Sequence, residues 1–193
     1  MKKAAKTVSD LGCLAGAARN IPVTGLAVDS RAVRPGYLFA ALPGLQVHGA
    51  DYISAALALG ATSILTDAAG VRRARSTLDG AKGICVWISE DPRQALAAAA
   101  ALWFGAQPDT MVAVTGTNGK TSVASFVRQI WTEMGHSAIN LGTNGVLGAW
   151  QAPLTHTTPE PITLHDTLSR AQAAGVTHAA LEASSHGLHQ RRL

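Results

Sequence analysis

The chain has 193 residues, of which 47% are hydrophobic and 15% charged, with a formal net charge of +4. This composition excludes intrinsic disorder, and the length suits one large domain or two small ones. The basic residues are dispersed and only three Phe and two Tyr accompany them, so we expect no nucleic-acid partner. No apolar stretch reaches the roughly 20 residues that span a bilayer, and no apolar core follows the N-terminal lysines. We therefore expect no membrane insertion and a cytoplasmic location.

The cysteine content also agrees with a cytoplasmic location. Cys13 and Cys85 are the only two cysteines, which are too few for a disulfide scaffold or a zinc site. Cys85 lies in the apolar run Ile84-Cys85-Val86-Trp87-Ile88, so we expect a buried, inert thiol there.

The first half of the chain alternates between predicted strands and helices. Short apolar or β-branched runs predict strands at 24–28, 37–41, 62–66 and 84–88. Helical spacing predicts a helix that stops at Gly60, and Asp91-Pro92 opens an Ala-rich helix that ends at Phe104. This alternation predicts a mainly parallel sheet covered by helices.

The segment Gly105-Ala106-Gln107-Pro108-Asp109 interrupts the alternation and is the predicted domain boundary, which gives domains at 1–106 and 107–193. A buried apolar strand at 111–115 is predicted to open the second domain. The helix after residue 120 carries an apolar stripe. Its members are Val123, Phe126, Val127, Ile130, Trp131 and Met134. A strand at 137–141, a helix at 161–174 and a strand at 178–183 complete a predicted βαβαβ unit.

The sequence Gly116-Thr117-Asn118-Gly119-Lys120-Thr121 lies between the predicted strand and the striped helix, which is where a phosphate-binding loop belongs. Glycines let backbone N–H groups turn toward a phosphate, and the helix N-terminus adds partial positive charge. Lys120 would then reach the β- and γ-phosphates, and the Thr121 hydroxyl would ligate Mg²⁺. The strict motif also requires a glycine at position 114, where this chain has valine. The alternative is a glycine-rich turn with a solvated lysine.

Glu182 interrupts an apolar strand near its carboxyl end. In open α/β sheets ligands bind at this edge, which also carries the loop after Thr115. We therefore expect Glu182 to support the Mg²⁺ that Thr121 touches, the alternative being a carboxylate that faces solvent. The segment Ser184-Ser185-His186-Gly187 lacks a nucleophile elbow, so we exclude a serine hydrolase. His186 and His189 lack a third ligand, and we expect ordinary polar histidines.

Three segments together resemble the Mur ligase family, and within it the MurE type. They are Gly116–Thr121, Thr157-Thr158-Pro159 and Glu182-Ala183-Ser184-Ser185-His186-Gly187-Leu188. The N-terminal half is also similar to the family's nucleotide-sugar domain, at Asp29-Ser30-Arg31, Gly36–Ala41, Gly44, His48-Gly49 and Asp51-Tyr52-Ile53. The implied fold is α/β: an N-terminal α/β nucleotide-sugar domain, followed by the first βαβαβ part of a P-loop ATPase domain, truncated.

The resemblance implies a ligase of peptidoglycan precursor synthesis that uses ATP and Mg²⁺. Its substrates are a UDP-N-acetylmuramoyl dipeptide and a diamino acid, lysine or diaminopimelate. The γ-phosphate activates the D-glutamate side-chain carboxylate as an acyl phosphate, which the amine of the diamino acid then attacks. Lys120 and Glu182 are the implied catalytic residues, and Thr121 and Glu182 the implied metal ligands.

The family's binding residues carry over onto matching positions of this chain. ATP would be held by Gly116, Thr117, Asn118, Gly119, Lys120, Thr121 and Ser122. The uridine part would meet Val28, Ser30, Leu45, Gln46 and Val47, and the muramoyl-peptide part Thr157, Thr158, Ser184, Gln190 and Arg192. Arg192 suits this role because a guanidinium pairs with carboxylate or phosphate in bidentate fashion.

The chain departs from the family in length, because the family's modified lysine and its amino-acid-binding domain have no counterpart before Leu193. We therefore expect these 193 residues alone to lack ligase activity, and we expect an exposed edge strand in the second domain. Two alternatives stay open: a P-loop NTPase regulated by its N-terminal domain, and a nucleotide-sugar-binding module without catalysis.

Overall fold

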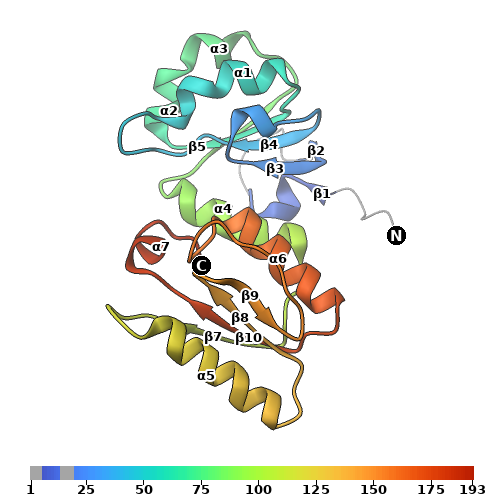
Figure 1. Cartoon of the computed structure of the whole chain (residues 1–193). Coiled ribbons are helices and arrows are strands. Elements are labelled where there is room, and N and C mark those ends of the chain that lie inside the picture. Colours follow the sequence, from blue (N-terminus) through green and yellow to red (C-terminus); the bar gives the residue numbers. More distant parts are fainter. Residues whose placement is uncertain (1–5, 14–19) are drawn as a thin grey trace. The chain divides into compact units, whose positions relative to one another are not determined.

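A computed structural model describes residues 6–13 and 20–193. The chain divides into two compact units, Met1–Trp103 and Phe104–Leu193 (Figure 1). The division falls close to the expected limit between residues 106 and 107. The separate roles assigned to the two domains stay a prediction.

A four-stranded parallel sheet forms the centre of unit 1, with its strands in chain order. They are β3 (Gly25–Ala27), β4 (Tyr37–Ala40), β5 (Ser63–Thr66) and β6 (Cys85–Ile88). A short antiparallel pair, β1 (Lys6–Thr7) with β2 (Pro22–Val23), precedes it. The parallel sheet confirms the architecture that the alternating pattern predicts.

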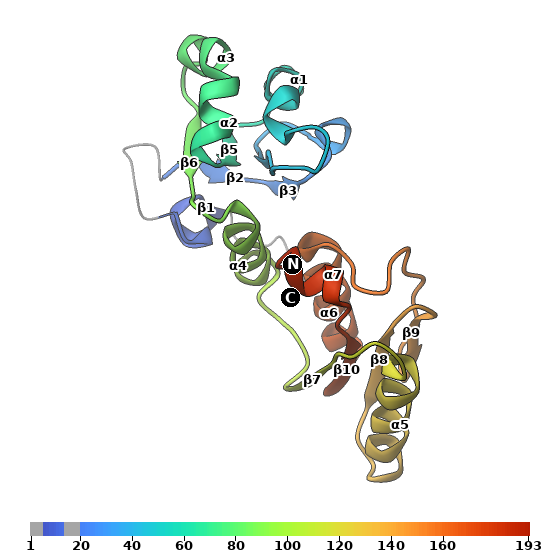
Figure 2. The ribbon, with the colours of Figure 1, turned by 90° about the vertical axis from the view of Figure 1, so that its left-hand side faces the viewer.

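Helices cover both faces of this sheet (Figures 1 and 2). The α-helices are α1 (Ile53–Ala58), α2 (Ala68–Arg73), α3 (Arg75–Gly80) and α4 (Pro92–Phe104), and the 3-10 turns are η1 (Ser9–Leu11), η2 (Ser30–Ala32) and η3 (Gly49–Tyr52). Phe39 and Ile64 pack with Ile53 of α1 in one buried cluster. Because side chains alternate along a strand, the neighbouring buried residues Leu38 and Leu65 face the opposite side.

Helices α2 and α3 were not predicted from the sequence. Their segment is short and rich in Ala and Arg, so it shows no clear apolar period. The start of α2 is set by a side chain instead, because Asp67 accepts a hydrogen bond from the Gly70 N–H at 2.6 Å and so caps the helix.

Unit 2 also contains a four-stranded sheet, but one strand runs against the others. The strands are β7 (Thr110–Val114), β8 (Ala138–Gly142), β9 (Gly145–Gly148) and β10 (His178–Glu182), in the order β7-β10-β8-β9. β9 pairs antiparallel with β8 through a tight hairpin in which Gly145 has a φ of 87°. The predicted βαβαβ unit is therefore interrupted by an antiparallel edge strand that the glycine-rich segment did not reveal.

Helices α5 (Lys120–Glu133) and α6 (Pro161–Ala173) lie on opposite faces of this sheet (Figure 2), and α7 (Ser185–His189) follows β10. Leu164 and Leu168 of α6 pack with Ile139 and Leu141 of β8. On the other face, Arg128 of α5 donates to the Asn140 side chain at 2.8 Å. Alternate residues of β8 thus serve the two faces.

One expectation about unit 2 was wrong. Residues 110–113 of β7 are exposed, although the strand is apolar and was predicted to be buried. Much of the α5 stripe is exposed as well, with 59% of Phe126 and 58% of Ile130 accessible. β7 pairs with β10 alone and forms an edge of the sheet, which leaves this strand more exposed than the central ones.

Within the described parts of the chain, no helix combines the length and the apolar character needed to cross a bilayer.

Candidate functional site

The loop between β7 and α5 has the backbone that the phosphate-loop hypothesis requires. Gly116 has a φ of 144° and Gly119 a φ of 81°, which are conformations that a residue with a side chain adopts only with strain. Residues 115–119 are exposed, and α5 begins at Lys120, immediately after Gly119. The unpaired N–H groups of the first turn of α5 therefore open toward solvent beside the loop.

Lys120 is turned back onto this loop. Its Nζ donates a hydrogen bond to the Gly116 carbonyl oxygen at 2.7 Å. The ammonium group is thus held against the backbone of the loop, and a phosphate oxygen placed there could accept a hydrogen bond from it.

Glu182 lies beside the loop, as expected. It is the last residue of β10 and pairs in register with Val114, at the end of β7. The residue is 3% exposed, and its Oε2 accepts a hydrogen bond from Thr121 Oγ1 at 3.0 Å. The two predicted metal ligands therefore touch each other.

Thr143 and Gly142, which the sequence analysis missed, hold this carboxylate. The Thr143 N–H donates to Glu182 Oε1 at 3.1 Å, and the Thr143 hydroxyl lies 3.4 Å from Oε2. A side chain at Gly142 would overlap the Glu182 carboxylate. Both residues stand at the carboxyl end of β8, next to β10, and that position was the available signal.

A second group of predicted residues surrounds the backbone of Glu182. The Thr158 hydroxyl lies 2.9 Å from the Glu182 carbonyl oxygen and accepts from the Ser184 N–H at 3.0 Å. Arg192 Nη1 donates to the Thr158 carbonyl at 2.7 Å, and Arg192 Nη2 to Gln190 Oε1 at 2.7 Å. Thr157 is connected to this group through Thr143, because the hydroxyl oxygens of the two residues lie 3.0 Å apart. The structure therefore brings together all five predicted muramoyl-peptide contacts.

The oxygen atoms at this edge fit Mg²⁺ better than a soft metal. Thr121 and Glu182 supply one hydroxyl and one carboxylate. Within residues 6–13 and 20–193, no group of three or more His, Cys, Asp or Glu could hold a metal by itself. Mg²⁺ normally binds one or two carboxylates together with substrate phosphates and water. The donor set is thus suited to a cation that arrives with a nucleotide.

Unit 1 carries an open cavity of about 670 Å³. Val28, Ser30 and Val47, three of the predicted uridine contacts, line it. The remaining lining residues are Asp29, Arg31, Phe39, Leu42, Gly49 and Tyr52. Leu45 and Gln46 belong to the same loop as Val47 but do not line the cavity, and Leu45 is 97% exposed.

The charged residues of the cavity neutralise each other. Arg31 Nη2 lies 2.7 Å from Asp29 Oδ2, and the Arg31 guanidinium and N–H hold the pKa of the Asp29 carboxyl below its ordinary value. The Arg31 side chain is 89% exposed, so its guanidinium is accessible to an anionic ligand while it is paired with Asp29.

Two family models match this chain. One, described as the Mur ligase family catalytic domain, matches residues 22–104, and the other, the Mur ligase middle domain, matches residues 114–193.

Curated relatives named UDP-N-acetylmuramoyl-L-alanyl-D-glutamate–2,6-diaminopimelate ligase match most of the chain. Those of Brucella melitensis and Caulobacter vibrioides are each 48% identical, over 92% and 89% of this chain. The Bradyrhizobium diazoefficiens protein is 49% identical over 90%. The chain spans about a third of each relative's length, 35%, 35% and 34% respectively.

A solved structure of a ligase with the same name superposes with a TM-score of 0.77 at 28% identity, covering 98% of this chain and 38% of that one. MurF from Acinetobacter baumannii, at 17% identity and a TM-score of 0.52, covers 85% of this chain and 31% of its own, and shares the fold.

Proposed function

Since the chain belongs to the Mur ligase family, we propose that it supplies the nucleotide-sugar-binding and ATP-binding parts of a peptidoglycan precursor ligase. The ligase would join a diamino acid to UDP-N-acetylmuramoyl-L-alanyl-D-glutamate, and the names of the relatives favour 2,6-diaminopimelate. One observation carries the proposal: the Thr121 hydroxyl at the start of α5 bonds the buried Glu182 carboxylate beside a glycine-rich loop.

Unit 2 would bind ATP along the loop from Gly116 to Ser122. The backbone N–H groups and Lys120 would hold the phosphates, because phosphoryl transfer depends mainly on positioning and on neutralising charge. Thr121 and Glu182 would hold Mg²⁺, which when bound with ATP neutralises developing charge on the phosphate oxygens. Thr143 would keep the Glu182 carboxylate turned toward Thr121.

The muramoyl peptide would reach the same edge of the sheet. Arg192 is held in place by Gln190 and by the Thr158 carbonyl, and its planar donors suit a carboxylate or phosphate. The γ-phosphate would pass to the D-glutamate side-chain carboxylate. The incoming amine would then displace phosphate from the acyl phosphate and form the amide.

Titration tests the two binding roles separately, with ATP plus Mg²⁺ in one calorimetric experiment and UDP-N-acetylmuramoyl-L-alanyl-D-glutamate in the other. We expect Lys120→Ala to weaken ATP binding about a hundredfold, because a charge-assisted contact to phosphate is lost. We expect the same variant to bind the nucleotide sugar within about twofold of the unmodified chain. Lys82→Ala is the matched control, since Lys82 is exposed in unit 1.

The results separate the proposal from its alternatives. Binding of the nucleotide sugar without any ATP binding would indicate a nucleotide-sugar-binding module without catalysis. Hydrolysis of ATP at a rate indifferent to the muramoyl dipeptide would indicate a P-loop NTPase.

A further inference from the structure

The loop from Leu42 to His48, which borders the unit 1 cavity, is folded tightly on itself. The Gly49 N–H donates to the Leu42 carbonyl at 2.8 Å and closes the base of the loop. A side chain at Gly44 would overlap the Val47 carbonyl oxygen, so the tip is equally compact. Leu42, Val47 and Gly49 line the cavity. The shape of this wall therefore depends on what holds the loop.

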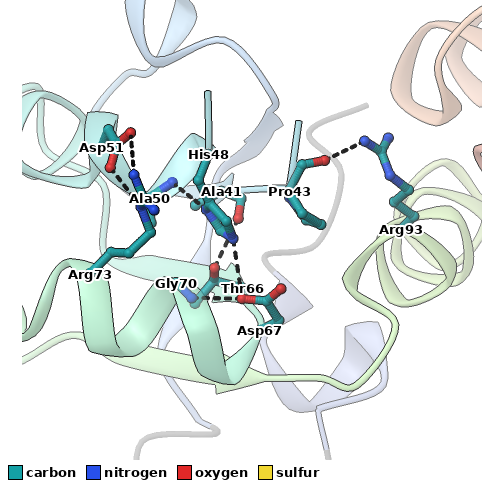
Figure 3. A network of polar contacts seen from close by, with 10 residues as sticks. All are labelled: Ala41, Pro43, His48, Ala50, Asp51, Thr66, Asp67, Gly70, Arg73 and Arg93. Carbon is teal, nitrogen blue, oxygen red and sulfur yellow. Dashed lines mark hydrogen bonds and ion pairs between the residues drawn. The ribbon is translucent and has the colours of Figure 1, made fainter. Parts of the chain in front are cut away.

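His48 attaches one end of the loop to two other elements (Figure 3). Its Nδ1 accepts a hydrogen bond from the Ala50 N–H at 3.0 Å, which caps η3. Because Nδ1 accepts, the proton of the neutral ring lies on Nε2, which is 3.2 Å from Asp67 Oδ1. Nε2 therefore donates to the carboxylate that also caps α2.

The surroundings leave this ring little freedom. The His48 side chain is only 11% exposed, and that of Asp67 22%. A side chain at Gly70 would come within 2.9 Å of the His48 ring, so the glycine lets the ring lie against α2. At the other end of the loop, Arg93 Nη2 donates to the Pro43 carbonyl at 2.5 Å (Figure 3). The loop is thus anchored at both ends.

We propose that His48 is a positioning residue for the nucleotide-sugar site: its Nε2–Asp67 hydrogen bond holds the Leu42–His48 loop in the shape that completes the cavity. His48 does not line the cavity, and its ring engages Asp67 and Ala50 instead. It therefore acts on the ligand through Val47 and Leu42. This inference rests on the proposed role of unit 1 in binding a uridine-diphosphate sugar.

The two ring nitrogens can be tested separately. In His48→Asn the amide oxygen can replace Nδ1 as the acceptor for the Ala50 N–H, but the side chain is too short to reach Asp67. In His48→Gln the amide N–H can replace Nε2 as the donor to Asp67, while the Ala50 bond is lost. Arg73→Gln is the matched control, because it breaks a neighbouring exposed ion pair with Asp51 (Figure 3).

Calorimetric titration of the full chain with UDP-N-acetylmuramoyl-L-alanyl-D-glutamate gives the dissociation constant, and urea denaturation gives the unfolding free energy. We expect His48→Asn and His48→Ala to weaken binding about tenfold, the loss expected for a hydrogen bond to a charged group. We expect His48→Gln and Arg73→Gln to stay within about threefold of the unmodified chain. His48→Gln should nevertheless be less stable than His48→Asn, because it loses the cap.

A positioning role thus predicts opposite orders for the two variants: His48→Asn binds the ligand more weakly, whereas His48→Gln is less stable. Equal affinity of His48→Asn and the unmodified chain would overturn the inference. Affinities that fall in step with stability across the three His48 variants would also overturn it, because they would show a structural role alone. If the unmodified chain fails to bind the nucleotide sugar at all, the proposed function of unit 1 fails first. Faster amide exchange at Leu45–Val47 in His48→Asn, with β5 unchanged, would support the inference even if His48→Ala does not fold.

Discussion

At the scale of single residues, Glu182 shows how much a buried charge needs its neighbours. Its carboxylate is 3% exposed and accepts hydrogen bonds from Thr121 and from the Thr143 backbone. Burying a carboxylate is costly unless such partners replace water. Gly142 makes the arrangement possible, because any side chain there would occupy the space of the carboxylate.

We expect Gly142→Ala to lower the unfolding free energy by about 1–3 kcal/mol, the usual cost of forcing an extra group into a packed site. The displaced carboxylate should also weaken the effect of Mg²⁺ on ATP binding. Urea denaturation and ATP titration with and without Mg²⁺ measure both effects. Gly80→Ala is the control, since a Cβ at Gly80 meets nothing within 4 Å. Equal stability of the two variants would contradict the prediction.

The Cys85 thiol confirms the expected buried cysteine and yields a prediction about pH. Burial, reinforced by the nearby Cys13 thiol, raises the pKa of Cys85 from 9.0 to about 11. The folded state therefore favours the neutral thiol, and the stability this contributes is fully present below pH 9.0 and is lost as the pH rises toward about 11.

We expect the unfolding free energy of Cys85→Ala to fall less steeply with rising pH than that of the unmodified chain. Urea denaturation at a series of pH values between about 8 and 11 measures this. Alkylation of Cys85 by iodoacetamide at about pH 8 should be roughly a hundredfold slower in the folded chain than in urea, because less thiolate is present. Rapid alkylation of the folded chain would contradict the assignment.

At the scale of elements, a side-chain cap marks the start of some helices, among them α2 and α6. Glu160 receives hydrogen bonds from the Ile162 and Thr163 N–H groups, both at 2.8 Å, at the start of α6. Pro161 follows at the first helical position, where the missing N–H costs nothing. Helix α6 carries Leu164 and Leu168 into the core, so its start also sets the packing of that face.

We expect Glu160→Ala to cost about 1 kcal/mol of unfolding free energy through the loss of this cap. Glu133→Ala is a matched control, because Glu133 is exposed in the last turn of α5, where a negative charge opposes the helix dipole. The control should leave stability unchanged or raise it slightly. Comparable losses in both variants would show that Glu160 is not acting as a cap.

At the scale of the whole molecule, the most unusual feature is that apolar side chains of β7 and α5 are exposed to solvent. Met111 and Val112 are each 37% exposed on an edge strand, and Phe126 and Ile130 are exposed on the helix. Unprotected edge strands with apolar side chains favour pairing between molecules. The predicted edge is thus present, and it is the strand that precedes the glycine-rich loop.

We expect Val112→Lys to reduce concentration-dependent self-association of the 193-residue chain, because a lysine on an edge strand opposes pairing. Static light scattering over a concentration series measures this. Gln129→Lys adds the same charge on α5 without removing an apolar group from β7. Equal reductions in both variants would assign the effect to net charge rather than to the strand edge.

Local pattern was sufficient to predict much of this molecule. The apolar runs predicted the parallel strands, because a strand covered on both faces is continuously apolar. The glycine-rich loop between strand and helix was also evident, because its conformation depends on glycine at Gly116 and Gly119. Glu182 could be expected beside it, since parallel strands bring their carboxyl ends to one edge.

Tertiary structure decided the rest. The exposure of β7 and of the α5 stripe could not be predicted from their apolar content, because burial depends on which neighbours are present to cover a surface. One partner of the Glu182 carboxylate, Thr143, directly follows β8, 39 positions earlier in the chain, and only the pairing of β10 with β8 places it there. The His48–Asp67 contact likewise joins residues that lie far apart in sequence and meet only because the loop after β4 and the start of α2 adjoin.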